Sequence, residues 1–408
     1  MTAGRGAPGR RLLAVTPTAI WAVADGVALR IHHLLEELVA DWDVSVIAAT
    51  PGPDAPGASS PPPGLALADY EAVTLTGRWR SIPSQFDTTP LVTAATRAVA
   101  RQQPAAMLLW PAAEFLAWTI PGAPHSVADR IDCLALTMWR AARRAAGDPS
   151  AGGPVRRGRR LAGALRTTLA VADYERRVVR RTAATVVVGR DDGAALRRLG
   201  APGSAARITV IPNGVAMPAS ADASSQPAPA RQPTVLFVGT LNYEPNIAAA
   251  RELATRIWPA VARALPEARL VIAGRNPTPE VLALAAPPAI AVHANIERMR
   301  DAFDAAWVCA APMVSGSGVK NKVLEGWAHG LPVVMSRLAA NGLPIPSGHD
   351  RLVTDDPGTA ADILVRLLSD PHERAQLGDE ARRFVRAAYS WTGAAAQVSA
   401  LLARQPLA

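Results

Sequence analysis

The chain alternates short apolar runs with amphipathic helical stretches along most of its length. The apolar runs RRLLAVTP (10–17) and DVSVIAAT (43–50) flank GVALRIHHLLEELVA (26–40), whose apolar residues recur every three or four positions. Strands that alternate with helices form a parallel sheet covered on both faces. The sequence therefore predicts an α/β fold, with further strands that include residues 126–136 and 350–356.

A stretch rich in Ala, Ser and Pro interrupts this pattern once, over residues 216–232, and is typical of a linker. A chain of 408 residues is long enough for two domains of roughly 100–200 residues each. We expect the first domain over 1–215, the second over 233–385, and a closing amphipathic helix over 386–408. Ligands of parallel sheets bind beyond the carboxyl ends of the strands, so we expect a site in a cleft between two facing sheets.

The composition bears on the cellular compartment in which the protein works. Cys133 and Cys309 are far apart in sequence, which argues against a disulfide framework. The basic N-terminus lacks the apolar core of a signal peptide, and no run of about 18 apolar residues suggests a membrane span. We therefore expect a cytoplasmic protein.

Arginine is unevenly distributed in this chain, whose formal net charge is +9. Residues 140–181 carry twelve arginines against three acidic residues. Solvated helix faces explain such a run, and peripheral contact with anionic lipid headgroups at the inner face of the membrane is the alternative. No series of aromatic residues interleaves with these arginines, which argues against nucleic acid as a partner.

Both lysines of the chain lie two residues apart in SGSGVKNKVLEGWAHGLPVV (315–334). A glycine-rich turn that leads into a helix exposes backbone N–H groups and the positive end of the helix dipole, which together bind anions. Lys320 and Lys322 fall where that dipole disfavours cations, so their placement indicates a bound anion such as phosphate. Glu325 lies on nearly the same helical face as Lys322 and can accept two vicinal hydroxyls. The alternative is a surface ion pair between Lys322 and Glu325 beside a loop without a ligand.

This segment resembles the donor-site signature of retaining GT-B glycosyltransferases of group 1 (GT4-like), in the branch that reads G-x-G-I-x-N-K-V-L-E-A-M-A. The segments VIPNGV (210–215), FVGTLNY to AGRNP (237–277) and YSWTGAAAQVSALL (389–402) agree with it in order. The resemblance covers 233–400 well and 1–215 more weakly. It implies two Rossmann-like, doubly wound domains that face each other across a cleft, with the closing helix crossing back to the first.

The resemblance implies that the second domain binds a nucleotide-diphosphate sugar. Lys322, helped by Lys320, would neutralise the diphosphate, and Glu325 would bind the ribose. Gly26 in the first domain would let the backbone approach the donor phosphate, and Arg30 would add charge there. The donor-binding residues implied in this way are Gly26, Gly239, Thr240, Asn295, Ile296, Ser317, Gly318, Val319, Lys320, Lys322 and Glu325.

The set contains three groups of neighbouring residues, each with its own role. Ser317, Gly318 and Val319 would offer backbone N–H groups to the diphosphate. The end of the second domain's first strand, at Gly239 and Thr240, would lie beneath the phosphates, and the loop at Asn295 and Ile296 would face the base. The sequence departs from the family's E-x7-E pattern, because Ser317 replaces the first glutamate, which contacts the sugar. It also has Gly326 and Trp327 in place of a small pair such as Ala-Met.

A catalytic acidic residue is expected near the carboxyl end of the strand that includes Asp129 and Asp132. The resemblance puts an acidic or histidine residue beside the reacting sugar, and we select Asp132, with His125 as the second candidate. Lys322 is the other expected catalytic residue, because charge builds on the leaving diphosphate and a prepositioned cation stabilises it. The family retains the anomeric configuration, with the leaving phosphate taking the acceptor's proton, so a strong protein base is not required.

We expect no metal and no cofactor. Asp41 and Asp43 form a D-x-D lookalike, but they lie at the wrong end of the sheet. His32 and His33 are adjacent, so a helix splays them by about 100° and makes them a poor metal pair. With the resemblance, this implies a metal-independent enzyme of the hexosyltransferase type.

The resemblance implies that the acceptor is a hydroxyl of a glycan or lipid-linked molecule in cell-surface polysaccharide biosynthesis. Two alternatives stay open. A sugar-nucleotide epimerase shares the two-domain shape but needs an acid/base constellation that the sequence does not show. A non-enzymatic nucleotide- or polyanion-binding protein would bind any polyanion in a salt-dependent way.

Overall fold

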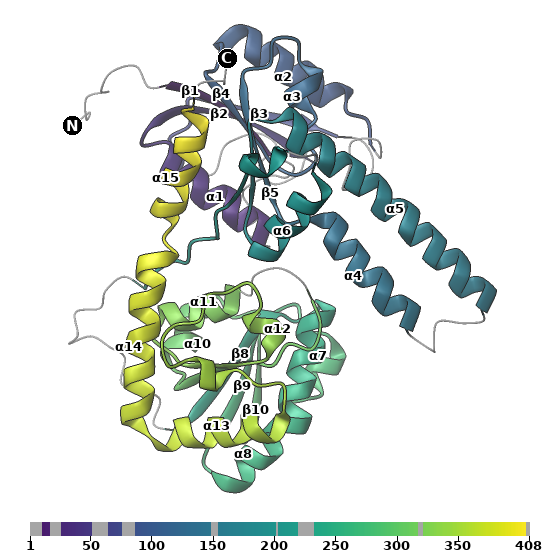
Figure 1. Cartoon of the computed structure of the whole chain (residues 1–408). Helices are drawn as coiled ribbons and strands as arrows, with labels where there is room; N and C mark the ends of the chain where they lie inside the picture. Colours follow the sequence, from purple (N-terminus) through teal and green to yellow (C-terminus); the bar gives the residue numbers. More distant parts are fainter. Residues whose placement is uncertain are drawn as a thin grey trace, which may run out of the picture. The chain divides into compact units, whose positions relative to one another are not determined.

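The computed structural model describes residues 10–16, 26–50, 64–75, 86–147, 154–200, 203–218, 232–316 and 321–404. The chain divides into two compact units. Unit 1 comprises Met1–Gly214 and Trp391–Ala408, and unit 2 comprises Val215–Ser390. Each unit is built on a parallel sheet with flanking helices, which confirms the predicted α/β class (Figure 1). Residues 219–231 of the predicted linker lie outside the described residues.

Unit 1 has a seven-stranded sheet in the order β3-β2-β1-β4-β5-β6-β7. All neighbouring strands are parallel, so their carboxyl ends meet at one edge. The strands are β1 (Arg10–Thr16), β2 (Trp42–Thr50), β3 (Asp69–Thr74), β4 (Ala106–Leu109), β5 (His125–Ile131), β6 (Ala184–Val187) and β7 (Ile208–Val210).

Two apolar layers cover the faces of this sheet, because successive side chains of a strand point to opposite sides. In β1, Leu12 and Ala14 join the layer under α1 (Gly26–Leu38) and α15 (Trp391–Leu402), whereas Leu13 and Val15 join the opposite layer. Helices of the opposite layer include α2 (Thr89–Gln102), α3 (Leu116–Thr119), α5 (Pro154–Arg181) and α6 (Arg190–Leu199).

The arginine-rich region forms two helices that pack side by side, α4 (Leu134–Gly147) and α5 (Figure 1). The predicted strand over 126–136 is partly wrong, because β5 ends at Ile131 and α4 already begins at Leu134. The backbone φ of Ile131 is +67°, which is incompatible with continuing a strand.

Unit 2 has a five-stranded parallel sheet in the order β10-β9-β8-β11-β12. Its strands are β8 (Thr234–Thr240), β9 (Arg269–Arg275), β10 (Ile290–Ala294), β11 (Val308–Ala311) and β12 (Val333–Met335). Its α-helices are α7 (Glu244–Glu252), α8 (Trp258–Ala264), α9 (Pro279–Leu282), α10 (Met299–Asp304), α11 (Asn321–Ala328), α12 (Arg337–Ala340), α13 (Pro357–Ser369) and α14 (Pro371–Ala388).

One sequence prediction in unit 2 needs correction. The predicted strand over 350–356 is a 3-10 helix (Asp350–Leu352) followed by a single bridge from Val353 to Met335. The chain leaves the sheet there because Asp356 caps α13, accepting a hydrogen bond from the N–H of Thr359. The last helix of the chain, α15, begins at Trp391 after α14 ends at Ala388.

A π-helical turn (Leu253–Ile257) separates α7 from α8. Pro259 lacks the N–H that would bond to the carbonyl of Thr255, and this loss loosens the helical ladder. No helix in the described part of the chain combines the length and the apolarity needed to cross a bilayer.

Candidate functional site

The sheet of unit 2 has a topological switch point between β8 and β11. From β8 the chain builds outward through β9 and β10, and from β11 it builds in the other direction to β12. Parallel sheets bind ligands beyond the carboxyl ends of the strands at such a point. Asn246 on α7, which follows β8, and Lys322 on α11, which follows β11, come together there.

The ammonium group of Lys322 is held by three neighbours at this switch point. Its Nζ donates a hydrogen bond of 2.7 Å to Oδ1 of Asn246, lies 4.2 Å from the ring centroid of Phe237, and is 3.7 Å from Sδ of Met313. The charge of Lys322 also acts on Glu325, on the same helix. These contacts fix the half-buried cation above the end of the sheet.

Glu325 lies one turn further along α11 and is half-buried. Burial raises the pKa of Glu325, and the nearby charge of Lys322 partly opposes that rise. Within the described part of the chain, the carboxylate of Glu325 has no hydrogen bond. A desolvated carboxylate without donors is costly, so a ligand that brings hydroxyl donors would stabilise it.

The floor beneath Lys322 depends on two glycines. Nδ2 of Asn246 donates a hydrogen bond of 2.9 Å to the carbonyl of Thr240, and a Cβ at Gly239 would lie only 2.8 Å from the Asn246 side chain. A Cβ at Gly274 would lie 1.8 Å from the carbonyl oxygen of Gly239. Both strand ends therefore need glycine so that β8, β9 and Asn246 can approach one another.

Sequence reasoning missed Asn246 as a functional candidate. Its signal was present: it is a polar residue in the first turn of α7, six residues after Thr240. Phe237 and Met313 were missed as well, because nothing in their local sequence indicates a cation above an aromatic ring.

The loop after β10 is tied to the loop after β9. Asn295 has a φ of +52° and its Oδ1 accepts a hydrogen bond of 2.8 Å from the N–H of Asn276. Ile296 is half-buried against the core, whereas Asn295 is exposed. The predicted donor residues Ser317, Gly318, Val319 and Lys320 lie outside the described residues.

The unusual Gly326–Trp327 pair has a packing explanation. A Cβ at Gly326 would lie 2.9 Å from the side chain of Val333 in β12, so glycine lets α11 approach the sheet closely. Trp327 is fully buried beside it.

A separate pocket of about 340 Å³ lies beside Met313, between the ends of β11 and β12, α13 and the π-helical turn. Neither Lys322 nor Glu325 lines it. The pocket adjoins the cation site through Met313, which lines it and also contacts the Lys322 ammonium.

In unit 1, Arg30 is buried and neutralised. Its Nε donates a hydrogen bond of 2.7 Å to Oδ2 of Asp129, and its Nη1 donates one of 2.9 Å to Oδ1 of Asn213. The expectation that Arg30 adds charge at the donor phosphate is therefore wrong, because Asp129 neutralises it inside the unit. Gly26 is the first residue of α1, which follows β1.

The two catalytic candidates occupy opposite ends of β5. His125 begins the strand, and its Nε2 lies 2.9 Å from the carbonyl oxygen of Leu401 in α15. It is therefore at the amino edge, away from where ligands bind. Asp132 directly follows the carboxyl end. Burial raises the pKa of Asp132 to about 6, and the charge of Asp192 acts in the same direction.

Residues His32, His33 and Glu36 on α1 lie closer together than the predicted splay implied. One possible ligand atom from each lies within 4.8 Å of the others, and this is the one such group of three among the described residues. His33 also stacks on Trp391 with ring centroids 4.8 Å apart. Asp43 lies near the amino end of β2, as expected for a residue outside any site.

Comparison with known proteins gives a family match for part of the chain and structural matches for nearly all of it. Residues 232–370 match the family model of the glycosyl transferases group 1. A glycosyltransferase from Rickettsia africae superposes with a TM-score of 0.64 at 10% identity, covering 96% of this chain and 98% of that chain. Anabaena Alr3699/HepE, in complex with UDP-glucose, superposes with a TM-score of 0.61 at 13% identity, covering 96% and 99%. The chain has the GT-B fold.

The family match lies within unit 2 of this GT-B protein and includes β8, Asn246, Lys322 and Glu325. None of the curated proteins matches the sequence.

Proposed function

We propose that this protein is a retaining glycosyltransferase that moves a sugar from a nucleotide-diphosphate sugar to an acceptor hydroxyl. The observation that carries the proposal is the Lys322 ammonium, held at the switch point of the unit 2 sheet next to the half-buried Glu325. The group 1 family match over these same residues supports it, as does the similarity to Alr3699/HepE, which binds UDP-glucose.

In this proposal Lys322 stabilises the leaving diphosphate. Negative charge grows on the diphosphate as the glycosidic bond breaks, and a cation already in place favours that state over the ground state. Asn246 and Phe237 hold the ammonium group, so little reorganisation is required during the reaction. Glu325 accepts the ribose hydroxyls, which supply the donors that its carboxylate lacks.

The remaining donor contacts follow the resemblance. Gly239 and Thr240 lie beneath the phosphates, and Asn295 and Ile296 meet the base. The backbone approaches the donor at Gly26. The loop residues Ser317, Gly318, Val319 and Lys320 complete the diphosphate site.

Asp132 is the proposed catalytic carboxylate toward the transferred hexosyl group. The proposed reaction uses no metal and no cofactor, because Lys322 supplies the positive charge. The leaving phosphate takes the acceptor's proton, and the anomeric configuration is retained.

We propose a glycan or lipid-linked acceptor in cell-surface polysaccharide biosynthesis, and a cytoplasmic protein that contacts the anionic inner face of the membrane. The α4–α5 pair supports the membrane contact. Trp139 and Leu169 are 44% and 69% exposed on these helices, and residues 149–172 contain arginines but no acidic residue. Nucleic acid is not a proposed partner.

The test is a thermal-shift screen with nucleotide diphosphates and their sugars on the parent and three variants. We expect one nucleotide to raise the midpoint of the parent, as linkage requires for a ligand that binds the folded state. Lys322→Ala and Glu325→Ala should lose this shift while remaining folded. Arg251→Ala removes an exposed cation of α7 that pairs with Glu280, and it should keep the shift. A parent that responds to no nucleotide diphosphate would overturn the proposal.

Product analysis separates the alternative enzyme. A glycosyltransferase incubated with donor and a mixed glycan acceptor forms a glycoside and releases the nucleotide diphosphate. An epimerase of the same fold would instead yield the epimeric sugar or its nucleotide, without needing an acceptor.

A further inference from the structure

Strand β5 ends in a backbone turn that a β-branched residue normally avoids. Ile131 has a φ of +67°, and the N–H of Asp132 donates a hydrogen bond of 2.7 Å to the carbonyl of Arg130. This three-residue turn, with a positive φ at its central residue, is the rare, strained form of the γ-turn. The register with β6 also shifts between Asp129 and Ile131. Strain of this kind persists only where the surrounding structure enforces it.

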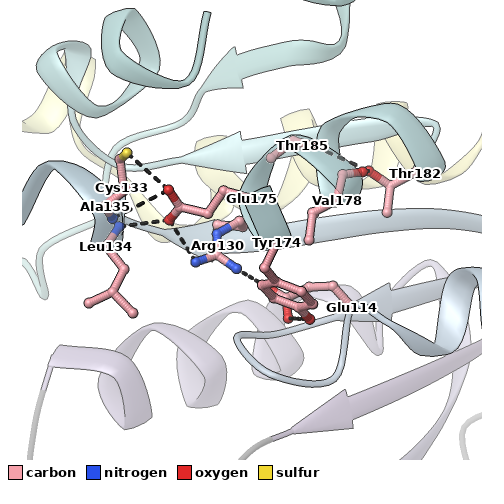
Figure 2. A network of polar contacts seen from close by, with 10 residues as sticks. All are labelled: Glu114, Arg130, Cys133, Leu134, Ala135, Tyr174, Glu175, Val178, Thr182 and Thr185. Atoms are coloured by element: carbon pink, nitrogen blue, oxygen red, sulfur yellow. Dashed lines mark hydrogen bonds and ion pairs between the residues drawn. The ribbon is translucent and has the colours of Figure 1, made fainter. Parts of the chain in front are cut away.

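Buried ion pairs anchor the residue before the turn. Nη1 of Arg130 donates a hydrogen bond of 2.6 Å to Glu114, and Nη2 donates one of 2.8 Å to Glu175 (Figure 2). The side chain of Arg130 is 2% exposed and both carboxylates are fully buried. Tyr174 donates a further hydrogen bond of 2.9 Å to Glu114. Arg130 therefore cannot shift without breaking two desolvated ion pairs.

The residues after the turn are anchored by the same carboxylate. Oε1 of Glu175 accepts the N–H of Leu134 at 2.8 Å, and Oε2 lies 3.3 Å from both the N–H of Ala135 and Sγ of Cys133 (Figure 2). Asp192 on α6 accepts the N–H of Cys133 at 3.0 Å. Glu175 therefore binds the chain on both sides of Asp132, and it serves as the N-terminal cap of α4 from another helix.

We propose that the turn at Ile131, held by the Arg130–Glu175 pair, is a positioning device that fixes the Asp132 carboxylate at the carboxyl edge of the unit 1 sheet. The inference rests on the proposed function, since the device serves to present Asp132 to the transferred sugar. Ile131, Arg130 and Glu175 are positioning residues that act through Asp132.

The charges around Asp132 are set by the same device. Asp192 on α6 and Glu175 on α5 disfavour a negative charge on Asp132, whereas Arg130 on β5 favours it. The charges of Arg140 on α4 and Asp191 on α6, which pair with each other, act on Asp192. A chain that relaxed at Ile131 would move Asp132 relative to these groups and return its pKa toward the ordinary aspartate value.

Two substitutions at one position separate the turn from side-chain packing. Ile131→Ala and Ile131→Gly both remove the side-chain atoms beyond Cβ. Only glycine adopts positive and negative φ about equally well, so only the glycine variant can leave the turn conformation freely. We expect Ile131→Gly to unfold at the same temperature as Ile131→Ala or higher. A functional loss specific to glycine then reports on the added backbone freedom at residue 131, because the glycine variant is at least as stable as the alanine variant.

The first readout is the pH dependence of unfolding by urea, measured for both variants with Asp132 and with Asp132→Asn. The difference in unfolding free energy between the Asp132 and Asp132→Asn proteins measures the contribution of Asp132. The pH range over which this difference changes should match the parent in Ile131→Ala and lie at lower pH in Ile131→Gly. Identical Asp132-dependent profiles in the two variants would overturn the proposal. This readout needs no substrate, so it decides the inference even if the proposed enzymatic activity is not found.

The second readout is turnover of the nucleotide sugar identified in the screen above. We expect Ile131→Gly to lower kcat by ~10²-fold, the loss typical of a misplaced catalytic group, with donor affinity unchanged. Ile131→Ala should retain most of kcat. Equal kcat in the two variants would contradict the positioning role, whereas absence of turnover in the parent as well would contradict the proposed function.

Discussion

The Nζ of Lys322 lies 2.7 Å from Oδ1 of Asn246, and this hydrogen bond joins the helices that follow β8 and β11 across the switch point of the sheet. The other end of the Asn246 amide is bonded to the carbonyl of Thr240. The Asn246 side chain therefore donates a hydrogen bond to the end of β8 through its Nδ2 and accepts one from the Lys322 ammonium through its Oδ1. This arrangement fixes the orientation of the amide and holds the positive charge in place before any ligand binds.

Asn246→Ala is expected to weaken donor binding without unfolding unit 2. Hydrogen bonds to charged groups contribute about 1.5–3 kcal/mol, so we expect a loss of roughly 10-fold or more in the affinity for the nucleotide sugar. Asn246→Asp should weaken binding as well, because a carboxylate beside Lys322 cancels the charge offered to the diphosphate. Isothermal titration calorimetry measures both, and an unchanged dissociation constant in the two variants would contradict the role of Asn246.

Gly274→Ala is expected to destabilise unit 2 more than Gly239→Ala. The new Cβ at Gly274 would meet the backbone carbonyl of Gly239 at 1.8 Å, whereas the Cβ at Gly239 would meet the Asn246 side chain, which can move. Overpacking of this kind costs about 1–3 kcal/mol in the free energy of unfolding, and backbone clashes lie at the upper end. Urea unfolding of both variants tests the order, and the reverse order would show that the strand ends can separate.

Glu325 is expected to make donor binding depend on pH. Burial raises the pKa of Glu325, and only the ionised carboxylate accepts hydrogen bonds from both ribose hydroxyls. Affinity for an intact nucleotide-diphosphate sugar should therefore be constant above this raised pKa and fall as the pH drops through it. Glu325→Gln should bind more weakly and without that dependence. Calorimetric titrations over a pH series distinguish the two, and parallel profiles would exclude Glu325 from the site.

Asp132→Asn is expected to stabilise the protein at neutral pH. The pKa of Asp132 is raised to about 6 in the folded state, against about 3.9 in the unfolded chain. A raised pKa means that protonation of Asp132 favours the folded state. The stabilisation that protonated Asp132 gives is therefore fully present below about pH 4 and is lost as the pH rises through 6. Above that pH the asparagine variant should be more stable by ~2–3 kcal/mol, and the two proteins should converge in acid. Urea unfolding at several pH values measures this difference, and a constant difference would contradict the assigned pKa.

The strands of both sheets were predictable from local patterns, because apolar periodicity depends only on neighbours in the chain. The strand prediction over 126–136 failed at Ile131 for a physical reason. Its turn is enforced by Glu175, which is 41 residues away from Leu134 along the chain. No local propensity places a β-branched residue at positive φ.

The sequence alone determined that unit 2 has a cation and a carboxylate one helical turn apart behind a glycine-rich turn, since that spacing is a property of α11 itself. Only the tertiary structure decided what these groups contact. Asn246 is 76 residues from Lys322, and Arg30 is 99 residues from Asp129, so parallel strand order alone brings each pair together. Burial then decides the electrostatics: Arg30 forms a buried ion pair with Asp129 inside unit 1, and desolvation raises the pKa of Glu325 in unit 2.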